Sequence, residues 1–140
     1  MIIREANASD IAALRELFLE VRRESFHWTD PEKLALSDFE KSTEGELILV
    51  ACVGDEIAGF ASVWTPERFI HNLFVSKAYQ GKGIGTALVA RTIQRVGLPL
   101  ALKCVKANAK ALAYYQSHGW TIAGEGPDTE GPYFLMTYAG

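Results

Sequence analysis

The sequence has few cysteines, no long hydrophobic run, and a long stretch without acidic residues. Cys52 and Cys104 are the only cysteines. Both lie in strand-like segments, so we expect reduced thiols and a cytoplasmic protein. No apolar stretch approaches the ~18 residues that a membrane span needs, and the N-terminus lacks the pattern of a signal peptide. Three widely spaced histidines without matched cysteines argue against a metal site.

Acidic residues are absent from 68–124, although the whole chain has 17 of them and a net charge of -3. The basic residues of this stretch are Arg68, Lys77, Lys82, Arg91, Arg95, Lys103, Lys106 and Lys110. This segregation favours a half of the protein that meets an anion, the alternative being lysines that only solvate helix surfaces. Nucleic-acid binding is less favoured, because the basic residues are dispersed and have no interleaved aromatic surface.

The length of 140 residues suits a single domain spanning 1–140. The hydrophobic patterning predicts the order strand, two helices, three strands, helix, strand, helix and two strands. Ser9 and Asn108 are the expected helix caps, Pro31 is expected to start the second helix, and Gly54–Asp55 is expected to form a hairpin turn. This order implies a three-layer α/β domain, in which helices cover both faces of a mixed sheet.

Three glycines stand where a strand is expected to give way to a helix, in AYQGKGIGTA (78–87). Glycine allows a close approach to the backbone, and a helix N-terminus offers unpaired N–H groups, so this arrangement suits phosphate or pyrophosphate. The sequence lacks the G-x-x-x-x-G-K-[ST] spacing of a nucleotide P-loop. The alternating Gly81, Gly83 and Gly85, without a later acidic residue, also exclude the dinucleotide fingerprint.

The segment from Gln80 to Gly85 matches Q/R-x-x-G-x-G/A, the pyrophosphate signature of the GNAT (GCN5-related N-acetyltransferase) superfamily. A second match follows in N-x-x-A-x-x-x-Y-x-x-x-G-F, with tryptophan in place of the last phenylalanine: Asn108, Ala111, Tyr115, Gly119 and Trp120. The chain therefore resembles this superfamily over about residues 68–122. The resemblance implies a GNAT-like α/β/α fold with a mixed, mostly antiparallel sheet and an acetyltransferase that uses acetyl-CoA.

The resemblance also implies which residues bind coenzyme A. Backbone amides of the glycine loop would bind the pyrophosphate, and the pantetheine arm would follow the preceding strand. Lys77, Lys82 or Lys110 could meet the remaining phosphate, and Asn108 could touch the cofactor as well as cap its helix. The complete set is Leu73, Phe74, Val75, Gln80, Gly81, Lys82, Gly83, Ile84, Gly85, Thr86, Asn108, Ala111 and Tyr115.

Tyr115 stands where the superfamily keeps its general acid, and a phenol can protonate a departing thiolate. Its neighbour Tyr114 is expected to pack in the core. The amine acceptor must lose a proton before it attacks, and His71 is the expected base, because imidazole titrates near neutrality. This histidine resembles the arrangement in aromatic-amine acetyltransferases. Ordered water, or an acid from the N-terminal half such as Glu24, is the alternative.

In relatives, the first helix pair and the loop between the last two strands line the site of the amine acceptor; we call this lining the acceptor wall. The residues expected there are Phe26, Trp28, Asp30, Asp128 and Tyr133, with Glu130 adding to the charge. An acidic wall with aromatic side chains favours a small-molecule amine or a lysine side chain as acceptor, acetylated by direct transfer in a ternary complex. The resemblance also allows a homodimer. A CoA-binding sensor without turnover is the rival interpretation, although such a module would not require Tyr115.

Overall fold

The structure is a computed structural model that describes residues 1–25, 30–127 and 131–140. The order of its elements is the predicted one. The main helices and strands are β1 (Ile2–Glu5), α1 (Ile11–Ser25), α2 (Asp38–Thr43), β2 (Leu47–Val53), β3 (Glu56–Trp64), β4 (Phe69–Val75), α3 (Ile84–Val96), β5 (Leu100–Val105), α4 (Ala109–Ser117), β6 (Thr121–Gly126) and β7 (Tyr133–Tyr138).

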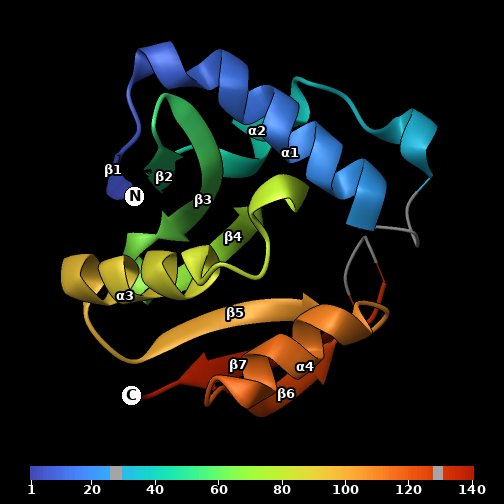
Figure 1. The fold of residues 1–140 in the computed structure, drawn as a ribbon. Coiled ribbons are helices and arrows are strands. Elements are labelled where there is room, and N and C mark those ends of the chain that lie inside the picture. The colour runs from blue at the N-terminus through green and yellow to red at the C-terminus, as the bar shows by residue number, and fades with distance from the viewer. Residues whose placement is uncertain (26–29, 128–130) are drawn as a thin grey trace.

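The seven strands form one sheet in the order β1-β2-β3-β4-β5-β7-β6. The β4–β5 pair is parallel and the other neighbouring pairs are antiparallel. The expectation of a mixed, mostly antiparallel sheet is therefore confirmed. The parallel pair lies at the centre of the sheet, and α3 provides the crossover between its two strands (Figure 1).

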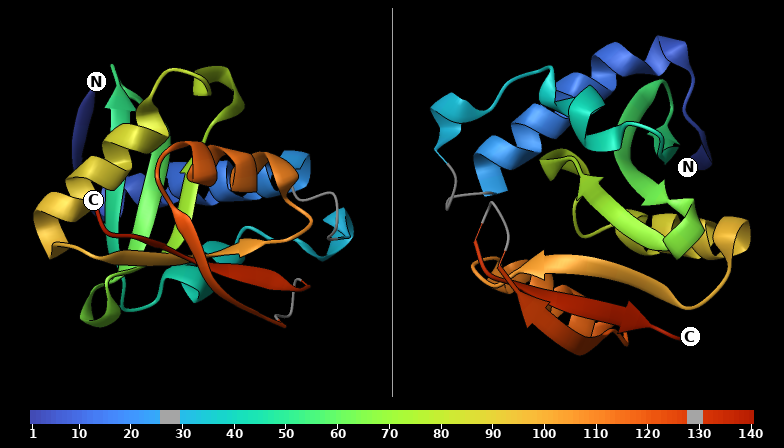
Figure 2. Two further views of the ribbon diagram at one scale, coloured as in Figure 1. Left: turned by 90° about the horizontal axis from the view of Figure 1, so that it is seen from below. Right: turned by 180° about the vertical axis from the view of Figure 1, so that it is seen from behind.

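Side-chain alternation along β2 explains why helices cover both faces of the sheet. Val50 packs with Phe18 of α1 and Phe39 of α2, whereas its neighbours Leu49 and Ala51 pack against α3. The predicted three layers are thus confirmed, and Figure 2 shows α3 and α4 on one side of the strands and α1 on the other. A further cluster between β5, β7, α3 and α4 includes Leu102, Cys104 and Trp120.

Two local predictions in the N-terminal half were wrong. The cap of the first helical segment is Asn7 rather than Ser9: its Oδ1 accepts from the Ser9 N–H at 3.0 Å. Pro31 begins only a short 3-10 turn, Pro31–Lys33, and α2 starts at Asp38. The Asp38 carboxylate accepts from the Ala35 N–H at 2.9 Å, which fixes the turn that precedes the helix.

The two cysteines form no disulfide: Cys104 is buried and Cys52 is half-buried. The longest described helix, α1, has 15 residues, and none of the helices among the described residues is long and apolar enough to cross a membrane.

Candidate active site

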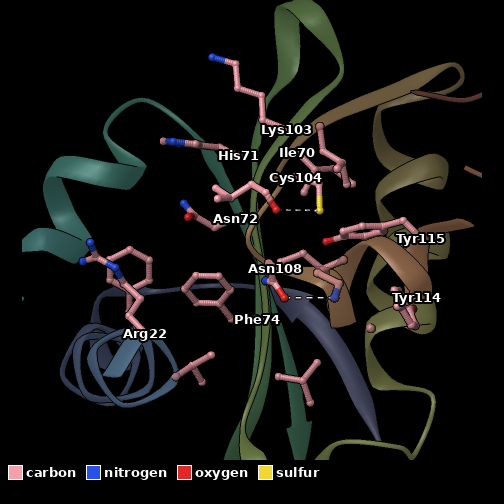
Figure 3. A pocket seen from close by; sticks show the side chains of 18 of the residues that line it. Arg22, Ile70, His71, Asn72, Phe74, Lys103, Cys104, Asn108, Tyr114 and Tyr115 are labelled. Carbon is pink, nitrogen blue, oxygen red and sulfur yellow. Dashed lines mark hydrogen bonds between the residues drawn. The ribbon is translucent and has the colours of Figure 1, made fainter. Parts of the chain in front are cut away.

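The strands β4 and β5 separate soon after they meet. They pair only at Phe69–Ala101 and Ile70–Leu102, so the backbone of β4 beyond Ile70 has no strand partner on its β5 side among the residues that the structure describes. A cleft of about 1400 Å³ occupies the opening. Figure 3 shows its walls, with His71, Asn72, Phe74 and Arg22 on one side and the two tyrosines of α4 on the other. Because the opening interrupts the sheet, the cleft joins the two helix-covered faces.

The glycine loop forms one end of this cleft. Gly81 and Gly83 have φ angles of +78° and +80°, and a Cβ at either position would meet no atom of the described residues within 4 Å. Gly83 is the N-cap of α3 and supplies no side-chain cap. The first N–H groups of α3 therefore have no intrahelical acceptor. Together with the positive end of the helix dipole, they make this loop suitable for an anion.

Two side-chain contacts connect the glycine loop to its surroundings. Gln80 donates through Nε2 to the Val75 carbonyl at 3.1 Å, and Lys110 of α4 donates to Gln80 Oε1 at 3.4 Å. The hydroxyls of Thr86 and Tyr114 lie 2.9 Å apart. Tyr114 lines the cleft instead of packing in the core, so that expectation was wrong. The phenol of Tyr114 therefore borders the loop that suits an anion.

Tyr115 also lines the cleft and is half-buried. Its ring packs edge-on against Trp120, with 5.6 Å between ring centroids. Loss of solvent, followed by the nearby Cys104 and Tyr114, raises the pKa of the Tyr115 hydroxyl. Burial likewise raises the pKa of Cys104 to about 11. Both groups therefore stay protonated at neutral pH, and the phenol can act as a hydrogen-bond donor.

Asn108 caps α4 as predicted, since its Oδ1 accepts from the Ala111 N–H at 3.1 Å. This cap fixes the first turn of the helix that carries Tyr115. Asn108 and Ala111 both line the cleft. The helix therefore presents its cap, a small residue and a tyrosine along one wall.

His71 lies on the opposite wall, at a bulge in β4. The register between β3 and β4 passes from Ser62–Asn72 to Val63–Ile70, which leaves His71 unpaired. Its Nδ1 lies 3.0 Å from Glu46 Oε2. The hydrogen bond to Glu46 raises the pKa of His71, and burial opposes it. In Figure 3 the imidazole points away from Tyr115. The two groups thus occupy opposite walls.

Asn72 and Arg22 complete this wall. The Asn72 amide donates to the hydroxyls of Ser62 at 2.8 Å and Ser42 at 3.1 Å. Arg22 pairs with Asp38 at 3.1 Å, and its guanidinium lies 4.8 Å from the centre of the Phe18 ring. These contacts hold polar side chains of α1, α2 and β4 at the cleft surface.

Most of the predicted site residues border this cleft. Those that line it are His71, Leu73, Phe74, Val75, Gln80, Gly81, Gly83, Ile84, Gly85, Thr86, Asn108, Ala111 and Tyr115. Lys82 does not line it; its Nζ lies 5.6 Å from the centre of the Tyr79 ring. Asp30 and Tyr133 also lie outside the lining. Phe26, Trp28 and Asp128 fall outside the described residues.

Glu46 is a cleft residue that no motif of the sequence indicates. It precedes β2 and reaches His71 across 25 positions of sequence. Glu24, the acid considered earlier, is exposed on α1 and does not line the cleft. Among residues 1–25, 30–127 and 131–140, no three His, Cys, Asp or Glu side chains gather into a group that could hold a metal ion.

Comparison with known proteins agrees with this geometry. The family model described as "Acetyltransferase (GNAT) family" matches residues 11–120. A GCN5-related N-acetyltransferase from Rhodopseudomonas palustris has a similar structure, with a TM-score of 0.82, 20% identity, and 99% of this chain and 95% of that chain covered. YjaB from Escherichia coli, in its apo form, gives a TM-score of 0.81 at 18% identity, covering 100% and 99%.

The ribosomal-protein-S18-alanine N-acetyltransferase from Escherichia coli is also similar, with a TM-score of 0.74, 22% identity, and 99% of this chain and 92% of that chain covered. At such identities these likenesses show the fold alone. None of the curated proteins matches the sequence significantly. The family model, however, covers most of the chain, from the first helix to Trp120. The chain therefore belongs to the GNAT acetyltransferase family.

Proposed function

We propose that this protein transfers an acetyl group from acetyl-CoA to a primary amine. The observation that carries the proposal is a single cleft that runs from the glycine loop at the start of α3 to Tyr115 and His71 on opposite walls. Acetyl-CoA would supply an activated acetyl thioester, and the transfer would be direct, within a ternary complex. The two free cysteines fit a reducing compartment such as the cytoplasm.

The residues present fit coenzyme A. Gly81 and Gly83 leave open space where side chains would stand, and the amides of Ile84, Gly85 and Thr86 begin α3. These groups would bind the pyrophosphate. The unpaired edge of β4 at Leu73, Phe74 and Val75 would hydrogen-bond the pantetheine arm.

Side chains from the loop itself and from α4 would complete the cofactor site. Lys110 already donates to Gln80 beside the loop, so it is well placed for a phosphate. Lys82 would add charge from outside the lining. Asn108 and Ala111 would border the arm from α4.

Tyr115 would donate a hydrogen bond to the leaving sulfur. Its raised pKa keeps the hydroxyl protonated over the working pH range, and donors aimed at developing negative charge lower a barrier. His71, on the opposite wall, would accept the proton that the acceptor ammonium loses, directly or through a water molecule. Because Tyr115 and His71 lie on opposite walls, the proton donor would approach the reacting atoms from one side and the base from the other.

The acceptor would be the amine of a small molecule or a lysine side chain. Tyr133, which lies outside the lining, would support the acceptor side through Lys103, because Lys103 lines the cleft and its Nζ lies 4.7 Å from the centre of the Tyr133 ring. Asp30, together with Phe26, Trp28 and Asp128, would contribute the rest of the acceptor wall. This assignment follows from the residue types, since an amine cation favours carboxylates and aromatic faces.

An acceptor panel tests the proposal. Purified protein is incubated with acetyl-CoA and a set of polyamines, amino sugars, amino acids and lysine peptides, while thiol release is monitored. We expect release with at least one amine, and mass spectrometry should find the acetylated product. Binding of CoA by calorimetry without turnover on any amine would instead support a sensor module. If well-folded protein takes up no CoA, the proposal is refuted.

A further inference from the structure

Glu46 is a buried carboxylate whose two oxygens have different surroundings. Its side chain is only 8% exposed. Oε2 lies 3.0 Å from His71 Nδ1, whereas Oε1 is buried and has no hydrogen-bond partner among the described residues. Buried polar atoms are nearly always paired. Burying a carboxylate costs free energy unless it is paired and hydrogen-bonded, and among the described residues His71 is the partner that the Glu46 carboxylate has.

The backbone on both sides fixes the pair. The Glu46 N–H donates to the Thr43 carbonyl at 3.0 Å, so the carboxylate is anchored at the end of α2, directly before β2 begins. On the other side, the β4 bulge releases His71 from the regular alternation and directs it toward α2 (Figure 3). The imidazole remains 46% exposed and lines the cleft.

The contact also determines which ring nitrogen can accept a proton. A carboxylate only accepts hydrogen bonds, so the His71 nitrogen facing Glu46 must carry the hydrogen. In the neutral ring, Nδ1 is therefore protonated and Nε2 holds the lone pair. Without this partner, either tautomer could form, and only one leaves Nε2 ready to accept a proton.

We propose that Glu46 is a positioning residue of the proposed acetyl transfer: it holds the Nδ1–H of His71, so that Nε2 accepts the proton of the acceptor ammonium. The N–H bond of the ammonium breaks, an Nε2–H bond forms, and the electron pair stays on the amine nitrogen. The imidazolium then faces the Glu46 carboxylate, which stabilises its charge, and the exposed side of the ring can return the proton to water. This inference rests on the proposed function, because it assigns a partner to the base.

The electrostatics of the ring agree with this role. The hydrogen bond to Glu46 is the largest influence and raises the pKa of His71, and the Ser42 carbonyl of α2 acts in the same direction. Burial and the positive charge of Lys103 on β5 oppose them. Among the described residues, the charged side chains that act on the ring are thus Glu46 from the α2–β2 connection and Lys103 from β5. A raised pKa makes the neutral imidazole a stronger base.

The test compares Glu46→Gln with Glu44→Gln. Glu44 is exposed two residues away, so its variant removes the same charge without touching the pair. The His71 ring is titrated by NMR in the protein without ligands, and its nitrogen shifts report the tautomer. We expect Glu46→Gln to lower the pKa of His71, and Glu44→Gln to leave it unchanged. With an active acceptor, kcat/KM should fall roughly tenfold in Glu46→Gln and about a hundredfold in His71→Gln.

The pH profile separates a positioning role from a structural one. The acidic limb of kcat/KM should follow the His71 titration and move to lower pH in Glu46→Gln. The inference is overturned if the pKa of His71 is the same in Glu46→Gln as in the parent protein. It is also overturned if that pKa falls while the acidic limb of kcat/KM stays at the same pH. These outcomes differ from failure of the proposed function, because in that case no amine would be acetylated by the parent protein either.

Discussion

Replacing Tyr115 with phenylalanine should separate catalysis from stability. The ring of Tyr115 packs on Trp120 at 5.6 Å and on Tyr114 at 5.4 Å between centroids. The variant keeps both ring contacts. Its free energy of unfolding should therefore stay within about 0.5 kcal/mol of the parent value.

The effect on rate should be much larger. A positioned proton donor contributes about 10²- to 10⁴-fold, and a hundredfold loss corresponds to about 2.7 kcal/mol in the activation free energy. We expect kcat to fall by at least that factor. The affinity for CoA should change less than about twofold, because the loop amides and Asn108 are untouched. Because the raised pKa keeps Tyr115 protonated, the parent protein should show no loss of rate from this group at mildly alkaline pH.

The assay combines steady-state thiol release, calorimetric binding of CoA and thermal unfolding. Tyr138→Phe is the matched control, because Tyr138 also packs on Trp120, at 5.5 Å, but does not line the cleft. Its kcat should equal that of the parent. A kcat within about threefold of the parent in Tyr115→Phe would refute the donor role.

Three further outcomes are expected. Gly83→Ala and Gly54→Ala should each lose about 1–2 kcal/mol of stability because both sites have positive φ, but only Gly83→Ala should weaken CoA binding in calorimetry; equal affinities would contradict the loop assignment. Asp10→Asn should lower stability in urea by about 1–2 kcal/mol, because the carboxylate accepts from Arg4 at 2.7 and 2.9 Å. Since Arg4 lowers the pKa of Asp10, this stabilisation should be present above about pH 4 and lost as pH falls through the lowered pKa; a flat acid dependence would refute it. The pKa of His71 is raised, so its ion pair should stabilise the fold fully below about pH 6.5 and lose that effect as pH rises through the raised pKa, a trend that His71→Gln should abolish in urea unfolding.

Local chemistry made much of the fold predictable. The Gly54 hairpin, the Asn108 cap and the glycine turn into α3 each depend on a few neighbouring residues, so their sequence signals suffice. The Ser9 prediction failed because Asn7 and Asp10 form a capping box together. The Asn7 side chain, rather than that of Ser9, therefore accepts from the free N–H groups of the first turn. The start of α2 was misplaced because a separate 3-10 turn precedes it.

The cleft was predictable on one side only. The cofactor half lies in one continuous stretch, so its residues were found together in sequence. The Glu46–His71 pair joins positions 25 apart, and it depends on a bulge whose place no local pattern marks. Tyr114 was misassigned for a related reason. Helical spacing puts it beside Tyr115, but only the position of α4 against the start of α3 decides that its hydroxyl reaches Thr86.

The parallel ladder between β4 and β5 has only two residue pairs, which makes it the weakest seam of an otherwise continuous sheet. A ligand lying in the opening would supply contacts where hydrogen bonds between β4 and β5 are missing. It would thereby connect β1–β4 with β5–β7. Ligand affinity and the mechanical cohesion of the two parts are then thermodynamically linked. Slower amide hydrogen exchange on both sides of the seam should accompany binding, even where no atom of the ligand touches the chain.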